Sequence, residues 1–271
     1  MDPLFGIFLG AVQGLTEFLP ISSSGHLVLF RNLMGFHEPE LLLDTSLHMG
    51  TLMAVIVYFR RDLAGMVKEF RAVFAPGGAA EGAGTYGERL SNALLTWVIV
   101  GNIPTALIGG IFKAPLENLY RSTTVVGFML LVTGLLLAVT RLGPGGNRRL
   151  GLPAALAVGT AQGLAIIPGI SRSGATIACG ILLGLDRDLA ARFSFLLSVP
   201  AIAGALLLEV LSGDAHRIGI LVLIAGGVSS VVAGLFALKV LMNMVRRGRL
   251  SWFAPYCWAL GLVVILVSFL P

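Results

Sequence analysis

Charged side chains are scarce in this 271-residue chain. Asp, Glu, Lys and Arg make up only 12% of it, whereas 56% of the residues are hydrophobic and the mean hydropathy is +0.90. An ordinary soluble domain is about 25% charged. So little charge cannot cover the surface of a soluble globule of this length. The composition therefore excludes a soluble enzyme, a disordered chain and a nucleic-acid-binding module, and it predicts a polytopic helical membrane protein.

Cysteine is also rare, and the N-terminus lacks a basic start. Cys179 and Cys257 both lie in apolar stretches, where a thiol is typically a small buried hydrophobe. We therefore expect neither a disulfide nor a metal pair. Because Met1-Asp2-Pro3 carries no positive charge and no small-residue cleavage site follows a short apolar run, we expect no cleavable signal peptide.

Six apolar stretches are long enough to cross a bilayer at about 1.5 Å of helix rise per residue. They lie near residues 42–59, 92–112, 123–141, 190–210, 217–241 and 252–270. Segment 60–91 is polar and basic, and it predicts a loop with one amphipathic surface helix. The Gly-rich segment 142–150 predicts a linker between two halves.

Two further apolar regions contain a break. Residues 3–33 are interrupted at 18–26, and residues 151–185 at 167–174, by segments rich in Pro, Ser and Gly. Apolar runs of 10–14 residues are too short to span a bilayer. Broken backbone at membrane depth is tolerated only where it is buried in protein or lines a cavity. Each region therefore predicts a re-entrant hairpin of two short helices.

The two broken regions repeat each other. Gln13-Gly14-Leu15 matches Gln162-Gly163-Leu164 at an offset of 149, and Ile21–Gly25 matches Ile170–Gly174 at the same offset. Each unit is one hairpin followed by three spans, so the hairpins must enter from opposite faces. The predicted fold is thus an all-α polytopic membrane protein, one membrane domain built as an inverted-topology repeat. The first repeat is 1–141 and the second is 151–271, joined by the linker 142–150.

The distribution of positive charge predicts the orientation. If segment 60–91 is cytoplasmic, so are 141–150, 185–192 and 239–250, and these together hold 14 of the 19 Lys and Arg residues. The segments expected on the outer side of the membrane contain Arg31, Lys113, Arg121 and Arg217. Cytoplasmic loops carry an excess of Lys and Arg. We therefore expect both termini outside, and hairpin tips that meet near the midplane.

Ionisable residues at membrane depth are functional candidates by default. Glu17, His26 and Arg172 lie at the two hairpin tips, among the polar residues Gln13, Thr16, Ser22, Ser23, Ser24, Ser171, Ser173 and Thr176. Freed backbone N–H groups at helix starts attract phosphate, and arginine presents a planar fork of donors to its oxygens. A serine beside a histidine and a carboxylate can be a nucleophile.

These parts together predict phosphoryl transfer from a lipid phosphate. Arg172 and backbone N–H groups would hold the anion, and a divalent cation on Glu17 would neutralise developing charge. His26 would move a proton, while Ser22 or Ser23 would attack or position a water.

At these residues the chain resembles a known family. Gln13-Gly14-Leu15-Thr16-Glu17-Phe18-Leu19-Pro20-Ile21-Ser22-Ser23-Ser24-Gly25-His26 is similar to the first signature of the undecaprenyl pyrophosphate phosphatases, which are bacterial membrane enzymes linked to bacitracin resistance. Pro168-Gly169-Ile170-Ser171-Arg172-Ser173-Gly174-Ala175-Thr176 resembles the second signature. The resemblance implies hydrolysis of the C55 isoprenyl pyrophosphate to the monophosphate carrier of cell-wall synthesis plus inorganic phosphate.

The resemblance also implies a location, a cofactor and residue roles. The enzyme would lie in the cytoplasmic (inner) membrane, with its site open to the periplasm, and would need Mg²⁺ or Ca²⁺. The family's acidic motif maps to Gln13 and Glu17, with Gln13 in place of the carboxylate found in many members. The catalytic serine and histidine map to Ser23 (or Ser22) and His26. The phosphate-binding arginine maps to Arg172, with Ser171, Ser173 and Thr176 as neighbours.

A second hypothesis from another class is a secondary transporter, or a flippase, of an anionic lipid or a small anion. Inverted repeats with broken helices are typical of transporters. An anion transporter would need the arginine and the helix ends, but not a Ser–His pair beside a carboxylate.

Simpler interpretations exist for single residues. Gln162 is expected to hydrogen-bond between helices, and Ser24 and Ser173 to cap helices. Asp44 and His48 fit a substrate path or a local pair equally well. Glu209 and His216 are expected to be solvated, and small-residue faces permit a homodimer.

Overall fold

The computed structural model describes residues 3–27, 41–74, 86–112, 119, 122–144, 146, 148–212 and 219–269. Within these residues the fold is all-helical, with a single isolated β-bridge between Arg148 and Leu185. The α-helices are α1 (Pro3–Phe18), α3 (Leu41–Tyr58), α4 (Arg60–Phe74), α5 (Tyr86–Ile111), α7 (Thr123–Val139), α8 (Leu152–Leu164), α9 (Arg172–Leu182), α10 (Arg187–Ser212), α11 (Ile220–Arg246) and α12 (Ala254–Ser268).

Some sequence-based expectations lie outside the described residues. These are residues 28–33 of the first hairpin, the outer-side cations Arg31, Lys113, Arg121 and Arg217, His216 and the side chain of Glu209.

Five helices are long and apolar enough to cross a membrane: Leu94–Ile111, Thr123–Leu142, Arg187–Leu208, Ile220–Arg246 and Leu250–Ser268. By length and composition they correspond to five of the six predicted spans. The sixth, 42–59, corresponds to α3, whose apolar part, Leu43–Tyr58, is shorter. Apolar side chains also point outward, with Val232 of α11 64% exposed and Leu266 of α12 66% exposed. The chain is therefore a multi-pass membrane protein.

The polar segment between α3 and α5 contains a helix, as the sequence predicted. Helix α4 covers Arg60–Phe74 and is amphipathic, with charged residues on one side and apolar residues on the other. Helix α5 begins at Tyr86 rather than near residue 92. The amphipathic helix is thus confirmed. The apolar span of α5 begins at Leu94, near the expected boundary, and the first turns of the helix lie in the segment that was expected to be a loop.

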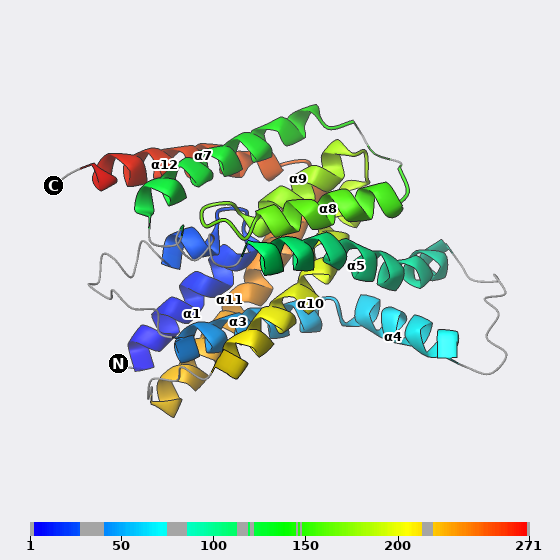
Figure 1. Ribbon diagram of the computed structural model, residues 1–271, viewed down its shortest axis with the longest axis horizontal. Coiled ribbons are helices and arrows are strands. Elements are labelled where there is room, and N and C mark those ends of the chain that lie inside the picture. Colours follow the sequence, from blue (N-terminus) through cyan, green and yellow to red (C-terminus); the bar gives the residue numbers. More distant parts are fainter. Residues whose placement is uncertain are drawn as a thin grey trace.

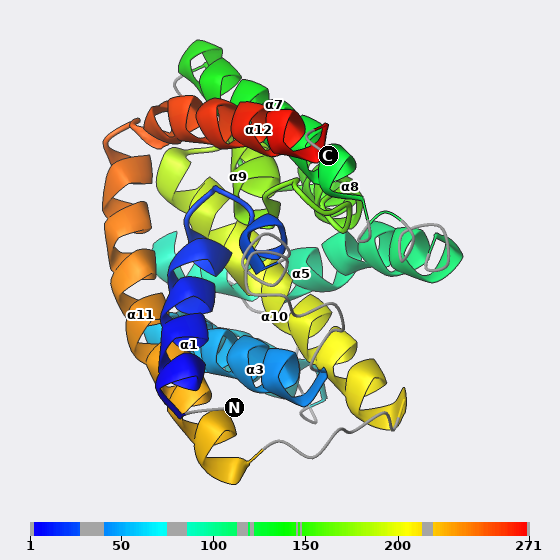
Figure 2. The same ribbon diagram turned by 90° about the vertical axis from the view of Figure 1, so that its left-hand side faces the viewer.

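Close glycine contacts join each broken region to a long helix. Helix α1 runs along α11 (Figures 1 and 2), and a Cβ added at Gly6, Gly10 or Gly14 would lie 2.6, 2.2 or 2.5 Å from a backbone oxygen of α11. Helix α8 packs in the same way on α5, where a Cβ at Gly159 would lie 1.8 Å from the carbonyl oxygen of Gly101. Only glycine lets these backbones approach so closely.

We expect Gly159→Ala to destabilise the protein by about 1–3 kcal/mol, the usual cost of inserting atoms into a packed contact. The added methyl group would overlap the α5 backbone, which cannot move aside as a flexible side chain can. The measurement is the thermal unfolding midpoint in detergent. Gly110→Ala is the matched control, because nothing lies within 4 Å of a Cβ at Gly110. Equal midpoints for the two variants would contradict the proposed contact.

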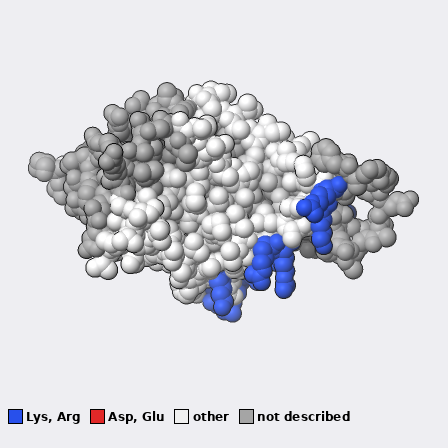
Figure 3. All heavy atoms as spheres, turned by 90° about the horizontal axis from the view of Figure 1, so that it is seen from below, with Lys and Arg blue, Asp and Glu red and all other residues white. Residues whose placement is uncertain are grey.

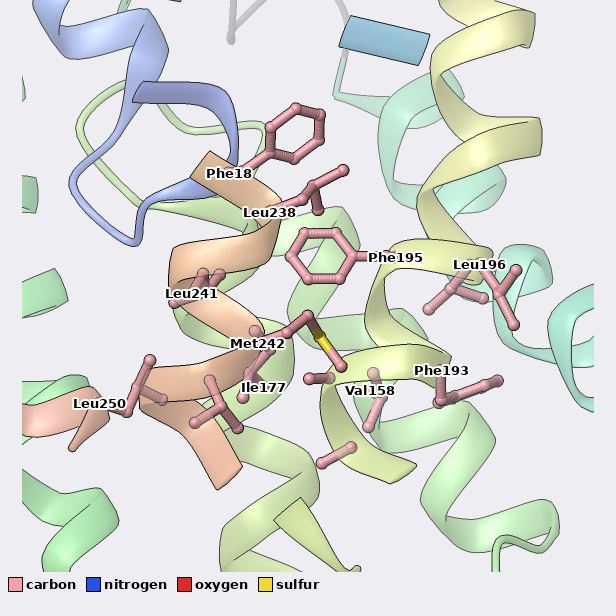
Figure 4. Close-up of a cluster of buried hydrophobic side chains, with 14 of the residues drawn as sticks. Phe18, Val158, Ile177, Phe193, Phe195, Leu196, Leu238, Leu241, Met242 and Leu250 are labelled. Carbon is pink, nitrogen blue, oxygen red and sulfur yellow. The ribbon is translucent and has the colours of Figure 1, made fainter. Parts of the chain in front are cut away.

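The largest apolar core surrounds the end of α1. Phe18 is 2% exposed, and its ring meets Phe195 of α10 edge to face with centroids 5.8 Å apart. Phe59 stacks on the same Phe195 ring at 5.8 Å. Figure 4 shows Phe18, Leu238 and Phe195 together at one end of this cluster. The packing fixes the last turn of α1, which carries Glu17.

Candidate active site

The first break follows Phe18. Pro20 cannot continue the helix, and Ser22 takes a positive φ of 68°, a conformation uncommon for a residue with a Cβ. The chain is helical again over residues 23–27. The Ser22 side-chain oxygen accepts a hydrogen bond from the Gly25 N–H (3.4 Å). The break therefore stores local strain, and it turns Ser23 back toward α1.

The second break joins α8 to α9 and is held by α7. Gly169 has a φ of +95°, and a Cβ there would lie 2.5 Å from the Val126 carbonyl oxygen. The Thr133 hydroxyl donates to the Gly169 carbonyl (2.9 Å) and accepts from the Ser171 N–H (3.0 Å). Ser171 is the N-cap of α9 and accepts from the Gly174 N–H (3.1 Å). These contacts fix the start of α9, where Arg172 stands.

The two breaks bring four predicted site residues together. Glu17 Oε2 accepts hydrogen bonds from Gln13 Nε2 (3.0 Å) and from Ser23 Oγ (2.6 Å). Glu17 Oε1 lies 3.6 Å from Arg172 Nη1, although the two residues are far apart in the sequence. The Glu17 side chain is only 6% exposed, whereas that of Arg172 is 34% exposed. The site thus combines the buried Glu17 carboxylate, the Ser23 hydroxyl that donates to it, and the partly exposed Arg172 guanidinium, which can bind a ligand.

His26 makes its contacts elsewhere. Its Nδ1 lies 2.8 Å from the Ser22 carbonyl oxygen, and its Nε2 lies 2.7 Å from the Tyr256 hydroxyl on α12. The two rings are almost parallel, at 3°. Among the described residues, the hydrogen-bond partner of Ser23 is Glu17 and not His26. The structure therefore does not bring together the expected Ser23–His26 pair.

The remaining predicted serines and the threonine line the two breaks. Ser22 Oγ lies 3.3 Å from Ser24 Oγ, and Ser171 Oγ lies 3.3 Å from Ser173 Oγ, so the two breaks share this local pairing. The Thr176 hydroxyl donates to the Arg172 carbonyl (2.7 Å) and is hydrogen-bonded to Ser194 of α10. Gln162 donates to the Thr105 hydroxyl (3.2 Å) on α5, as expected for a residue that joins helices.

A small pocket opens at Glu17 and Arg172, and α10 forms one of its walls. Ser194, Phe195, Ser198 and Ile202 of α10 line it together with Phe18 and Ser173. Sequence reasoning missed Ser194, Ser198 and Tyr256. The two serines lie in an uninterrupted apolar span, and Tyr256 has no motif around it, so neither region carries a local signal.

The donor set at Glu17 fits a divalent cation that is shared with a substrate. The Gln13 side-chain oxygen is buried next to the Glu17 carboxylate and has no hydrogen-bond partner among the residues that the structure describes. Carboxylate and amide oxygens are ligands of Mg²⁺ and Ca²⁺, and Mg²⁺ typically takes one or two carboxylates plus substrate phosphates. In the described part of the chain, no three His, Cys, Asp or Glu side chains gather to hold a metal by themselves.

Comparisons with known proteins show the family of this chain. The family model described as bacitracin resistance protein BacA matches residues 6–263. A protein of Desulfatibacillum aliphaticivorans named undecaprenyl-diphosphatase is 49% identical over 270 residues, which cover 97% of this chain and 98% of the relative. A protein of Desulfosudis oleivorans with the same name is 50% identical, with 99% of each chain covered. A third, from Halothermothrix orenii, is 43% identical over 97% of this chain and 96% of the relative.

Both signature segments, 13–26 and 168–176, fall inside the matched range, and the relatives align with nearly the whole chain. The chain belongs to the bacitracin resistance protein BacA family.

Proposed function

We propose that this protein is a phosphatase that hydrolyses undecaprenyl pyrophosphate to undecaprenyl phosphate and inorganic phosphate, which recycles the lipid carrier of cell-wall synthesis. The observation that carries this proposal is the contact of Ser23 and Arg172 with one buried carboxylate, Glu17, in a pocket of a chain whose relatives are named undecaprenyl-diphosphatase. The fold alone would not decide between an enzyme and a transporter.

Glu17 is proposed to accept the proton of the attacking group. The Ser23 hydroxyl already donates to Glu17 Oε2, so this carboxylate can take the proton when Ser23, or a water held by it, attacks the terminal phosphorus. A new O–P bond forms, and the bond from that phosphorus to the bridging oxygen breaks. The lipid monophosphate leaves with the bond electrons. Where Ser23 is the attacking group, a water then attacks the phosphoserine, the Ser23 O–P bond breaks, and inorganic phosphate is released with the serine restored. His26, which bonds the Ser22 carbonyl, is proposed to hold the turn that presents Ser23.

Arg172 is proposed to bind the phosphate oxygens. Its guanidinium has five N–H donors, and its contact with Glu17, at 3.6 Å, leaves most of them free. Ser171, Ser173, Thr176, Ser22 and Ser24 line the same breaks, where they are proposed to assist in substrate binding.

A divalent cation, Mg²⁺ or Ca²⁺, is proposed to be held by Glu17 and the Gln13 side-chain oxygen. When bound, such an ion neutralises charge on the pyrophosphate oxygens. We expect purified protein to release phosphate from undecaprenyl pyrophosphate only when a divalent cation is present. A chelator should abolish turnover, and excess Mg²⁺ or Ca²⁺ should restore it.

The discriminating experiment follows phosphate release and lipid movement in the same vesicles. Release of inorganic phosphate supports the phosphatase. Movement of the intact pyrophosphate lipid across the bilayer without phosphate release would overturn the proposal in favour of a flippase, the alternative that the predicted inverted repeat suggests.

We infer an inverted-topology repeat with two re-entrant hairpins. The offset of 149 between the motifs supports this architecture, as do the matching breaks and the similar glycine packing of α1 on α11 and of α8 on α5. In the proposed orientation the basic segments lie on the cytoplasmic side of the inner membrane, and the candidate active site opens to the periplasm. Labelling single cysteines placed in 142–150 from either side of the membrane tests the orientation.

A further inference from the structure

A second pocket lies at the ends of three long helices. It is lined by Tyr58 at the end of α3 and Phe59 after it, by Arg60, Arg61 and Asp62 of α4, by Arg192 of α10, and by Met242 and Arg246 of α11. Its volume is about 280 Å³. It shares no lining residue with the pocket at Glu17. The proposed hydrolysis makes no use of it.

The pocket has an excess of positive charge. Arg192 Nη1 lies 2.9 Å from Asp62 Oδ1, and Arg192 Nε lies 2.7 Å from Asp188 Oδ2. Asp188 also binds Arg246 Nε at 2.6 Å. Among the described side chains, two carboxylates, Asp62 and Asp188, therefore face the four guanidinium groups of the pocket.

The two remaining arginines are free to bind a ligand. Among the described residues, Val57 accepts a hydrogen bond from Arg60 through its carbonyl (3.4 Å), and neither Arg60 nor the exposed Arg61 forms an ion pair. The ion pairs fix the side chains of Arg192 and Arg246. The guanidinium groups of Arg60 and Arg61 have N–H donors that can bind a ligand in the pocket. Such an arrangement fits an anion, and guanidinium groups match phosphate oxygens best.

Helix α4 places apolar groups next to this charge. Val67 is 52% exposed and Phe70 is 54% exposed, and Lys68 and Arg71 on the same helix are also exposed. An amphipathic helix with this composition lies in a membrane interface. In Figure 3, which looks from below, Lys and Arg side chains gather toward the end where α4 lies in Figure 1, and no acidic side chain of a described residue shows on that face. The occupant should therefore carry both a phosphate and apolar chains.

We propose that this pocket binds the phosphate head group of an anionic phospholipid, with its acyl chains beside the apolar residues of α4. Basic pockets between transmembrane helices are typical sites for such head groups. A free phosphate ion would use the arginines but would leave the exposed Val67 and the aromatic Tyr58 without a role.

The test is a binding titration of the purified full-length protein in detergent, by native mass spectrometry, with phosphatidylglycerol as the probe. The double variant Arg60→Gln/Arg61→Gln should bind this lipid roughly 30-fold more weakly than wild type, since each basic residue near a lipid surface contributes about a factor of five. The matched control, Arg148→Gln/Arg149→Gln, removes the same charge from the linker and should bind as wild type does.

Three results would overturn the proposal. One is unchanged phosphatidylglycerol binding in the pocket variant, and another is equally tight binding of phosphatidylcholine to wild type. The third is equally tight binding of inorganic phosphate, which would indicate a soluble anion instead of a lipid. If the double variant does not fold, Arg61→Gln alone serves, because that exposed side chain has no ion pair to lose among the described residues and should weaken binding about five-fold.

Discussion

Replacing Glu17 by Gln should lower phosphate release by at least about 100-fold, the low end of what a positioned general base contributes. The substitution keeps the size of the side chain and its place between Gln13 and Ser23, but it removes the negative charge. The neutral amide can neither take the Ser23 proton nor balance Arg172. Steady-state phosphate release from undecaprenyl pyrophosphate, measured at saturating Mg²⁺, gives the loss in kcat.

Asp186→Asn is the matched control for this change. Asp186 Oδ1 accepts from the backbone N–H groups of Asp188 and Leu189 at the start of α10, and Asn caps a helix nearly as well as Asp. Its turnover should stay close to that of wild type. Raising the concentration of the divalent cation should not restore the kcat of the Glu17→Gln variant, because a bound ion cannot replace Glu17 as the proton acceptor. Turnover of Glu17→Gln within a few-fold of wild type would contradict the role assigned to this carboxylate.

Hydropathy predicted most of the fold, because the bilayer demands long apolar helices with satisfied backbones. It placed five spans and the amphipathic helix α4. It failed at boundaries where a helix extends past the apolar stretch. Helix α11 continues from residue 241 to Arg246, with Met242 and Val245 fully packed against neighbours. Tertiary packing, which a hydropathy window does not register, decides such ends.

The sequence also predicted the main contact of the site, because the repeat implied that two hairpin tips meet. The contact of Glu17 with Arg172 is the link that this repeat predicts. The repeat could not predict which side chains His26 contacts. Its partner, Tyr256, lies 230 residues away on α12, which also contacts the first break where the Cys257 thiol donates to the Pro20 carbonyl (3.5 Å). The partners of a polar side chain depend on this geometry and not on its own motif.

Replacing Arg172 by Ala should lower kcat/KM by at least about 100-fold, the scale seen when a group that stabilises developing charge is removed. The side chain is one-third exposed at the pocket, and its position at the first turn of α9 is fixed by the Ser171 cap. Arg172→Lys should recover only part of the loss, because an ammonium keeps the charge but lacks the planar fork that binds two phosphate oxygens together. Both variants should be compared by phosphate release across a range of lipid concentrations.

The split between KM and kcat then identifies what the arginine does. A rise in KM alone would mean that Arg172 only binds the pyrophosphate, whereas a fall in kcat means that its contacts strengthen as the bond breaks. We expect a fall in kcat, since the 3.6 Å contact with Glu17 leaves the guanidinium room to move onto the terminal phosphate. Arg148→Ala, which removes an exposed arginine hydrogen-bonded to the Leu183 carbonyl, should leave both constants unchanged. An Arg172→Ala variant that behaves in the same way would exclude this residue from catalysis.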